Sequence, residues 1–306
     1  MIIFFKKRKV IVTHGGSFHA DDLFACATLK ILYPCAKIIR AKRGESLPKG
    51  DIVLDIGGIY DPQRNLYDHH QKEGAGFHEG STIPYASFGL IWKHFGMQVC
   101  KGNKGVWERI EKKIVLPTDA VDNGIAPNKN LEEGVSSYFG DQVFLVFSPT
   151  WEEGEEDIDK VFLEQVENAK RVIEREIYVA FADTKGEEMI NSSYQNTKDK
   201  RVIELKENFP RYLYQDFLCQ FEEPLYVIYP SADKKTWNAE GIRKSLGTLE
   251  SRLPFPQDWR GSLDDASLAN ITGVTDAVFC HRSGFLASAK SKEGAMKLVE
   301  LSLKQI

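Results

Sequence analysis

The sequence has few cysteines, no paired cysteine motif and no long hydrophobic run. Its five cysteines are scattered over 306 residues and form no C-x-x-C pair. An odd number of isolated thiols argues against a disulfide framework or a thiolate zinc site and favours a reducing compartment. No apolar run reaches the ~20 residues that span a bilayer, and the chain does not open with the charged-then-apolar pattern of a secretory signal. The sequence therefore predicts a cytoplasmic protein that does not cross a membrane.

The chain also lacks a charge excess of either sign. Forty Lys and Arg residues against 44 Asp and Glu residues give a formal net charge of −4. This balance excludes a general polycation, such as a histone-like binder of nucleic acid, and a strongly acidic disordered protein. It leaves open an enzyme that acts on nucleic acid, because such an enzyme needs only a local basic groove. The length and the 42% of hydrophobic residues predict two domains with cores of their own.

Short apolar, β-branched segments alternate with segments of helical periodicity in the first half of the chain. The expected strands are 10–13, 37–40 and 51–56. The expected helices are 21–32, 87–95 and 105–116. This alternation predicts an α/β fold with a largely parallel sheet, and the apolar strands fit a sheet that helices cover on both faces.

The second half predicts a long helix and then a smaller α/β domain. Apolar residues recur at helical spacing over 155–183, whereas 184–200 is polar and weakly patterned, as is typical of a domain boundary. The elements expected beyond it are strands at 202–205, 225–229 and 277–279 and a closing helix at 292–306. We therefore divide the chain into residues 1–185, which include the long connecting helix, and residues 186–306.

Histidines and aspartates concentrate where predicted strands end, which is the edge at which open α/β sheets bind ligands. The residues in question are His14, His19 and Asp21 after the first strand, Asp55 after a later one, and the motifs Asp68-His69-His70 and Asp119-Ala120-Val121-Asp122. Imidazole and carboxylate ligands without thiolate suit Mn²⁺, Mg²⁺, Fe²⁺ or Zn²⁺, and Mn²⁺ is favoured where carboxylates dominate. More ligands are present than one ion needs, which indicates two ions ~3.5–4 Å apart that share a carboxylate.

Each of these residues also has a simpler structural interpretation. Asp22 is a favourable charge for the first turn of a helix, and Asp68 can serve as a cap. Solitary histidines such as His78 and His94 are expected to be structural. The metal hypothesis is favoured because five candidate ligands all fall at predicted strand ends, namely His14, His19, Asp21, Asp55 and His69.

The ordered set of motifs resembles the Myg branch (melanocyte-proliferating-gene type, DHH-like exonucleases) of the DHH phosphoesterase superfamily. Asp68-His69-His70 is the tripeptide after which that superfamily is named. The other matching segments are 14–21, 119–124, 259–261 and 281–285, so that the resemblance covers nearly the whole chain. One departure is Asp22, where the resemblance implies Glu, at a position that we do not assign to a metal.

The resemblance implies two divalent ions, with Mn²⁺ favoured over Mg²⁺. The first ion would be held by His14, His19 and Asp55. The second would be held by Asp21, Asp55, His69 and Asp122, with Asp119 as the alternative to Asp122. Asp55 would thus bridge the ions, and His70 would orient ligands or meet the scissile phosphate. Asp55, His69 and His70 are the expected catalytic residues.

Cations that bind the substrate phosphate are expected in the second domain. The candidates are Arg243, Lys244, Arg252, His281 and Arg282. His281-Arg282 follows a predicted strand and matches a family motif, whereas a surface salt bridge is an equally good interpretation of Arg243 and Arg252.

The residues alone indicate a dimetal phosphoester hydrolase with its active site between two domains. The resemblance implies a 3′–5′ exonuclease that acts on RNA or short oligonucleotides by attack of a metal-bound hydroxide on phosphorus. A dimetal pyrophosphatase or small-nucleotide phosphohydrolase is an alternative, which the modest cationic density of the second domain disfavours. A further alternative is a non-catalytic nucleic-acid-binding or regulatory protein, which the complete ligand set disfavours.

Overall fold

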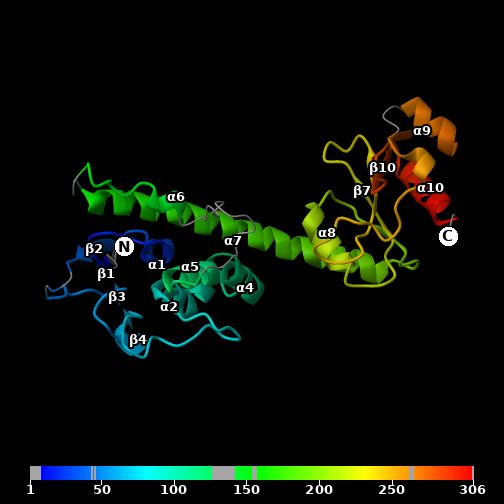
Figure 1. The fold of residues 1–306 in the computed structure, drawn as a ribbon. Helices are drawn as coiled ribbons and strands as arrows, with labels where there is room; N and C mark the ends of the chain where they lie inside the picture. Colours follow the sequence, from blue (N-terminus) through cyan, green and yellow to red (C-terminus); the bar gives the residue numbers. More distant parts are fainter. Residues whose placement is uncertain are drawn as a thin grey trace, which may run out of the picture. The chain divides into compact units, whose positions relative to one another are not determined.

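The chain folds into two compact units, Met1–Phe181 and Ala182–Ile306 (Figure 1). The structure is a computed structural model, and it describes residues 8–42, 44, 46–125, 142–153, 157–261 and 265–304. The first two residues of the long helix predicted over 155–183 lie outside the described residues. Each unit contains one five-stranded sheet with helices packed against it, which confirms the predicted α/β class.

The sheet of the first unit is largely parallel, as the sequence predicted. Its strand order is β2 (Lys37–Ala41), β1 (Val10–His14), β3 (Ile52–Leu54), β5 (Leu66–Tyr67) and β4 (Tyr60–Asp61). β1 pairs in parallel with β2 and β3, and β3 pairs in parallel with β5, whereas β4 is antiparallel to β5. β4 and β5 were not expected, because two residues are too few to give an alternating pattern. Since β1, β3 and β5 run in parallel, the residues that follow them meet at one edge.

The helices of the first unit form the other part of its core. They are α1 (Ala20–Leu32), α2 (Ser87–Ile91), α3 (Met97–Val99), α4 (Lys104–Ile110), α5 (Leu116–Asp122) and α6 (Gln142–Leu145). π-helical turns at 92–96 and 111–115 join α2 to α3 and α4 to α5, so that the second stretch runs six residues beyond the predicted end at 116. Leu23, Phe88 and Trp92 are fully buried, and each such side chain contributes about 2–3 kcal/mol of burial free energy.

The long helix α7 (Ile158–Asn196) extends 13 residues beyond the predicted end at 183. Phe162 and Val166 on its first part are buried in the core of the first unit. Ile190 and Tyr194 on its last part are four residues apart, so they share one helix face, and both are buried in a core of the second unit. Two apolar residues among polar neighbours are too few to predict a helix from periodicity. Their burial nevertheless stabilises the last turns of α7.

The sheet of the second unit is mixed and mostly antiparallel. Its strand order is β6 (Val202–Glu204), β7 (Tyr226–Pro230), β8 (Trp237–Gly241), β10 (Leu286–Ala289) and β9 (Ala277–Cys280). The helices of this unit are α8 (Arg211–Leu218), α9 (Asp265–Thr272) and α10 (Lys292–Leu303). β8 and β10 were missed because they contain no β-branched residue. Among the described residues, no helix is both long enough and apolar enough to cross a membrane.

Candidate metal centre

Two buried residues, His14 and Asp55, face each other where β1 and β3 end. Nδ1 of His14 lies 3.2 Å from the carbonyl oxygen of Gly15, which leaves Nε2 for the interior of the site. Nε2 lies 3.1 Å from Oδ2 of Asp55 and 3.0 Å from Oδ2 of Asp22. His14, Asp22 and Asp55 therefore offer one nitrogen and two oxygens within 4.8 Å of one another.

Asp55 is the residue that connects the parts of the site. It adopts a left-handed backbone conformation with φ of +55°, a strained geometry that is concentrated at functional sites. Its Oδ2 faces His14, while its Oδ1 lies 3.3 Å from Nε2 of His69 and 3.5 Å from Nδ1 of His70. The hydroxyl of Ser87 donates to the same Oδ1 at 3.1 Å. One carboxylate thus presents Oδ2 to one imidazole and Oδ1 to two others, as a bridging ligand does.

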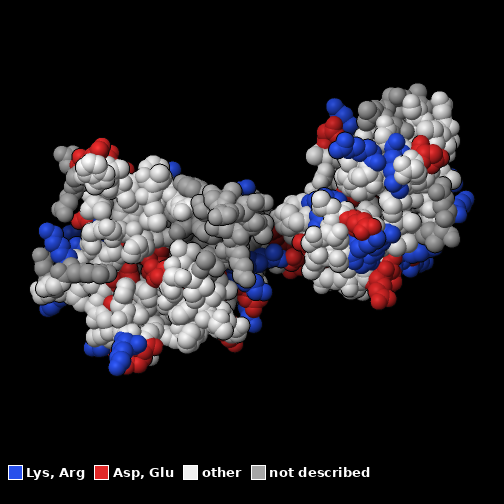
Figure 2. All heavy atoms as spheres, viewed as in Figure 1, with Lys and Arg blue, Asp and Glu red and all other residues white. Residues whose placement is uncertain are grey.

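Asp21, at the start of α1, is 1% exposed, and neither of its carboxylate oxygens has a hydrogen-bond partner among the described residues. It forms a second possible ligand group with His19 and Asp122, whose Nδ1 and Oδ1 atoms lie 4.0 Å apart. Asp122 is the last residue of α5 and also lies 3.4 Å from Nε2 of His69. A buried carboxylate without donors is costly unless a cation balances it. In Figure 2 acidic side chains are visible between the positions of β1 and α5.

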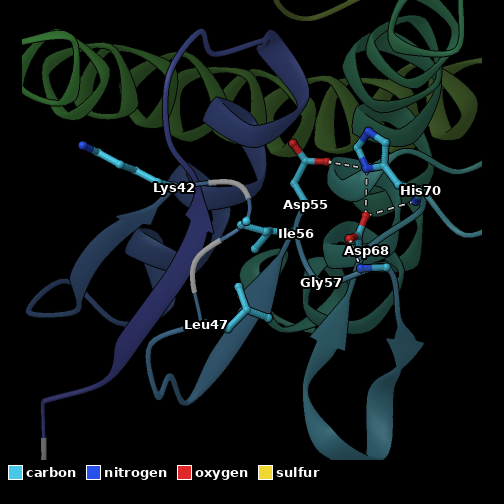
Figure 3. A pocket seen from close by; sticks show the side chains of 9 residues that line it. Lys42, Leu47, Asp55, Ile56, Gly57, Asp68 and His70 are labelled. Atoms are coloured by element: carbon cyan, nitrogen blue, oxygen red, sulfur yellow. Dashed lines mark hydrogen bonds and ion pairs between the residues drawn. The ribbon is translucent and has the colours of Figure 1, made fainter.

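Asp68 positions His70 at the mouth of a cavity (Figure 3). Asp68 is 1% exposed, and its Oδ1 lies 2.8 Å from Nδ1 of His70, while its Oδ2 accepts from the backbone N–H of Gly58 at 2.5 Å. The side chain of His70 is half exposed, and its Nε2 edge is not used by Asp68. The cavity measures about 350 Å³ and is lined by Asp55, His70, the Gly57-Gly58 turn and Lys42. Its size is in the range of small-ligand sites.

The protonation of the site shows how much negative charge it concentrates. Burial, together with the charges of Asp55 and Asp122, holds the pKa of Asp21 well above its usual range. Burial alone would lower the pKa of His14, but hydrogen bonds to Asp22 and Asp55 raise it to about 10. Without an added cation, the cluster thus takes up protons. Oxygen and imidazole donors with buried, unpartnered atoms fit divalent cations of the Mn²⁺ or Mg²⁺ type.

The structure brings together all six residues expected as ligands. His19 lies within ligand distance of Asp21 and Asp122, and its ring centroid is 5.9 Å from that of His14. Asp22, which we did not assign to a metal, takes the place beside His14. Its other oxygen accepts from the backbone N–H of His19 at 3.1 Å, so it also caps α1. The spacing of Asp22, three positions after His19, is typical of a capping residue. From the sequence we expected only a favourable charge in the first turn of the helix.

Asp119, the alternative to Asp122, faces away from this cluster. Its carboxylate accepts from the backbone N–H groups of Ala86 at 2.8 Å and Gly89 at 3.1 Å, and Oδ2 lies 2.7 Å from Nε2 of His78. Nδ1 of His78 lies 2.6 Å from Oε1 of Glu111. Burial raises the pKa of Asp119, yet three donors surround its carboxylate. We therefore assign a charged His78 between two carboxylates.

The cationic side chains of the second unit that were expected to bind substrate differ in how many of their N–H groups already donate to other residues of the chain. Arg252 donates to the carbonyls of Cys219 at 2.7 Å and Pro224 at 3.0 Å and also to those of Phe221 and Glu222, so it fixes the loop between α8 and β7. Arg243 lies 3.5 Å from Asp216, and Lys244 pairs with Glu250.

His281 and Arg282 lie in the turn between β9 and β10, where Nδ1 of His281 is 2.7 Å from Oγ of Ser283. Arg282 is exposed, and no described residue pairs with it. Of the five cations expected to bind substrate, Arg282 therefore has no partner within the described residues, and His281 uses only its Nδ1 there. Basic and acidic side chains are interspersed over the second unit in Figure 2.

Comparisons with known proteins agree over nearly the whole chain. A family model described as "Uncharacterised protein family (UPF0160)" matches residues 10–303. The chain is 32% identical over 333 residues to a MYG1 exonuclease of Bos taurus, covering 96% of this chain and 84% of that one. It is 31% identical over 339 residues to a MYG1 exonuclease of Homo sapiens (96% and 86%). It is 27% identical over 329 residues to a MYG1 protein of Dictyostelium discoideum (96% of each).

A solved structure of RecJ from Thermus thermophilus in complex with Mg²⁺ is also similar, with a TM-score of 0.28 and 12% identity. The match covers 97% of this chain and 50% of that one. So weak a likeness carries no weight for the fold or for the site.

Proposed function

The chain belongs to the MYG1 exonuclease family, and on this premise we propose that it is a metal-dependent phosphodiesterase that removes nucleotides from the 3′ end of single-stranded RNA. The observation that carries this proposal is the buried carboxylate of Asp21, for which the described residues provide no donor and which lies among His19, Asp122 and the charge of Asp55. Such a carboxylate is costly to keep charged unless a cation neutralises it, and divalent ions would do so without protonating the ligands.

Two divalent ions, Mn²⁺ by preference, would be held by the two faces of this cluster. The ligand residues would be His14, Asp22, Asp55, His69, His19, Asp21 and Asp122. When bound, such ions lower the pKa of a water and neutralise the charge that develops on phosphoryl oxygens.

The remaining steps are carried by residues of the chain. Oδ1 of Asp68 would accept from the Nδ1–H of His70, so that the imidazolium form of His70 would present its Nε2–H to a phosphate oxygen or a leaving group in the cavity and become neutral after donating that proton. The hydroxyl of Ser87 donates to Oδ1 of Asp55 and so limits rotation of this carboxylate. From the second unit, Arg282 and His281 would contact the substrate phosphates.

The test compares Asp21→Asn with wild type, because this change keeps the side-chain volume and removes the charge. We expect wild-type protein to bind about two equivalents of Mn²⁺ by elemental analysis and to shorten a 5′-labelled 20-mer RNA stepwise, which identifies digestion from the 3′ end. EDTA should abolish the activity and Mn²⁺ restore it. Asp21→Asn should lose metal and at least ~100-fold in activity.

The same assay separates the alternatives. A protein that hydrolyses pyrophosphate or a dinucleotide but leaves the 20-mer intact would be a small-substrate phosphohydrolase. A Mn²⁺-loaded protein that is inert on all three substrates would be a binding or regulatory protein. Labelled DNA of the same sequence shows whether the 2′-hydroxyl matters.

We also propose the cytoplasm as the location. All five cysteines are free thiols, and Cys26, Cys100 and Cys280 are buried. Unpaired thiols are typical of a reducing compartment.

A further inference from the structure

A second, larger cavity of the first unit lies beside the loop that follows His14. It measures about 870 Å³ and is lined by the Gly15-Gly16-Ser17 backbone, by Arg40 and Lys42, by Trp151 and by the start of α7. Lys42 also lines the cavity that contains Asp55 and His70. In Figure 3 its ammonium group points away from Asp55, and Lys42 is the lining residue that the two cavities share. The two cavities therefore adjoin at Lys42.

Arg40 cannot serve as the phosphate-binding cation of this second cavity. Its guanidinium donates to the carbonyls of His14 at 3.1 Å and Gly16 at 2.7 Å and to Oδ1 of Asp159 at 2.8 Å. Its carbon lies 4.3 Å from the ring centroid of Phe162. Arg40 thus fixes the loop after His14 against α7. Lys42 is exposed and, within the described part of the chain, pairs with no carboxylate.

Trp151 is the most exposed large hydrophobic residue among those described, with 90% of its surface accessible. It stands on a turn in which the backbone N–H of Thr150 donates to Oε2 of Glu153 at 2.7 Å, and the N–H of Glu153 donates back to the carbonyl of Thr150 at 3.1 Å. The turn therefore presents an indole to solvent. An exposed indole offers a flat apolar face on which a planar base can stack.

We propose that this second cavity, which we name the Trp151 cavity, binds the nucleotide next to the one at the metal centre. The inference rests on the proposed function. The base would stack on Trp151, and its phosphate would meet Lys42. A neutral base suits this cavity, because Asp157 and Asp159 in its lining would repel an anion. Lys42 lines both cavities and would therefore meet the phosphate that connects the two nucleotides. The site takes single-stranded nucleic acid of at least two nucleotides.

The test measures binding and hydrolysis separately. Binding of a fluorescein-labelled 10-mer oligouridylate is followed by anisotropy in Ca²⁺. Hydrolysis of the 10-mer and of bis(p-nitrophenyl) phosphate, which is too small to reach both cavities, is followed in Mn²⁺. Trp151→Ala should weaken binding and raise the KM for the 10-mer by about 5- to 100-fold, because stacking contributes that much per base. Trp151→Phe should stay within about threefold of wild type on the 10-mer, and both Trp151 variants should hydrolyse bis(p-nitrophenyl) phosphate as wild type does.

Lys42→Met should weaken binding of the 10-mer and reduce the slope of log Kd against log salt by about 0.7, the value for one phosphate contact with a single strand. Two matched controls belong to the same unit. Lys37→Met changes an exposed lysine at the opposite end of β2, and Tyr178→Ala removes a 65% exposed aromatic residue from α7. Both should bind the 10-mer like wild type.

Two different failures are distinguishable. If Trp151→Ala and Lys42→Met bind and cleave the 10-mer like wild type, the Trp151 cavity is not a nucleotide site, although the protein remains a nuclease. If wild type hydrolyses bis(p-nitrophenyl) phosphate but neither binds nor cleaves the 10-mer, the proposed function itself fails and the inference with it. Equal losses on both substrates would indicate damage to the metal centre and would also overturn the inference.

Discussion

Oδ2 of Asp119 lies 2.7 Å from Nε2 of His78, and both side chains are buried. Asp119 stands one turn before Asp122 on α5, and it also accepts from the backbone at the start of α2, which carries Ser87. One carboxylate therefore connects the helix that presents an expected ligand with the helix that orients Asp55. We therefore expect Asp119 to act as a positioning residue.

Asp119→Ala and Asp122→Ala should consequently have opposite signatures. Removal of Asp119 leaves two backbone donors unpaired and leaves Glu111 as the one carboxylate beside His78, which should lower the free energy of unfolding by about 3–5 kcal/mol. Asp122→Ala should change stability in EDTA by less than about 1 kcal/mol but weaken Mn²⁺ binding at least ~10-fold. Urea unfolding in EDTA and calorimetric Mn²⁺ titration measure the two effects. A stable Asp119→Ala variant that has lost Mn²⁺ affinity would instead identify Asp119 as the ligand.

The same pair predicts a dependence of stability on pH. Burial alone would lower the pKa of His78, but hydrogen bonds to Asp119 and Glu111 raise it to about 9. Because this value exceeds the ~6.5 of an unfolded histidine, the stabilisation is fully present below pH ~6.5 and is lost as the pH rises through about 9; such a shift corresponds to roughly 3 kcal/mol. The difference in unfolding free energy between wild type and His78→Gln in EDTA should therefore shrink over this range. His14 titrates nearby, but it is common to both proteins and cancels. A difference independent of pH from 6 to 10 would contradict a charged His78.

The sequence predicts the parallel sheet and the position of its ligands for a simple physical reason. His14 is the last residue of one short apolar strand and Asp55 directly follows another, so the topology alone brings them to one edge. It does not predict which of Asp119 and Asp122 faces that edge, since this depends on the rotation of α5. The π-turn at 111–115 shifts that rotation by about one residue, and periodicity does not reveal such a turn. The pairing of His78 with Asp119 spans 41 residues and has no local signal.

Asp22 should prove part of the metal centre. Its Oδ2 lies 3.0 Å from Nε2 of His14, and its Oδ1 accepts from the N–H of His19. Asp22→Asn keeps the size and can keep the bond to His19, but it removes the charge that faces His14. We expect Mn²⁺ affinity to fall about 10- to 100-fold while the urea midpoint in EDTA changes little. Unchanged affinity, measured by calorimetric titration, would leave Asp22 with the capping role alone.

Arg252 and Arg282 should separate a structural arginine from a substrate-binding one. Arg252→Ala leaves four carbonyls without their donor and should destabilise the second unit by about 2–4 kcal/mol, with faster amide hydrogen exchange over 219–225. Arg282→Ala removes an exposed side chain without a described partner, so stability should change by less than about 0.5 kcal/mol. A raised KM for the 20-mer in Arg282→Ala would support a substrate contact. If the Arg252→Ala variant were as stable as the wild type, the hydrogen bonds from Arg252 to the four carbonyls would be dispensable.

Gly89 on α2 should be irreplaceable, although glycine inside a helix is normally unfavourable. A Cβ atom at this position would lie 1.9 Å from Oδ2 of Asp119 and 2.8 Å from the ring of His78. Gly89→Ala must therefore push the buried pair apart, and we expect a loss of more than about 2 kcal/mol together with weaker Mn²⁺ binding.

Gly105→Ala in α4 is the matched control. Its added Cβ would find only Oδ1 of Asn103, at 3.5 Å, so it should gain up to about 1 kcal/mol from better helix propensity. Urea unfolding of both variants in EDTA, followed by Mn²⁺ titration, distinguishes the cause. If Gly89→Ala gained stability as Gly105→Ala does, the backbone of α2 would not lie as close to the Asp119 carboxylate as the structure has it. If Gly89→Ala lost stability but kept full Mn²⁺ affinity, Asp119 would stabilise the fold without positioning the ligands, because the pair could then be displaced without moving Asp122 or Asp55.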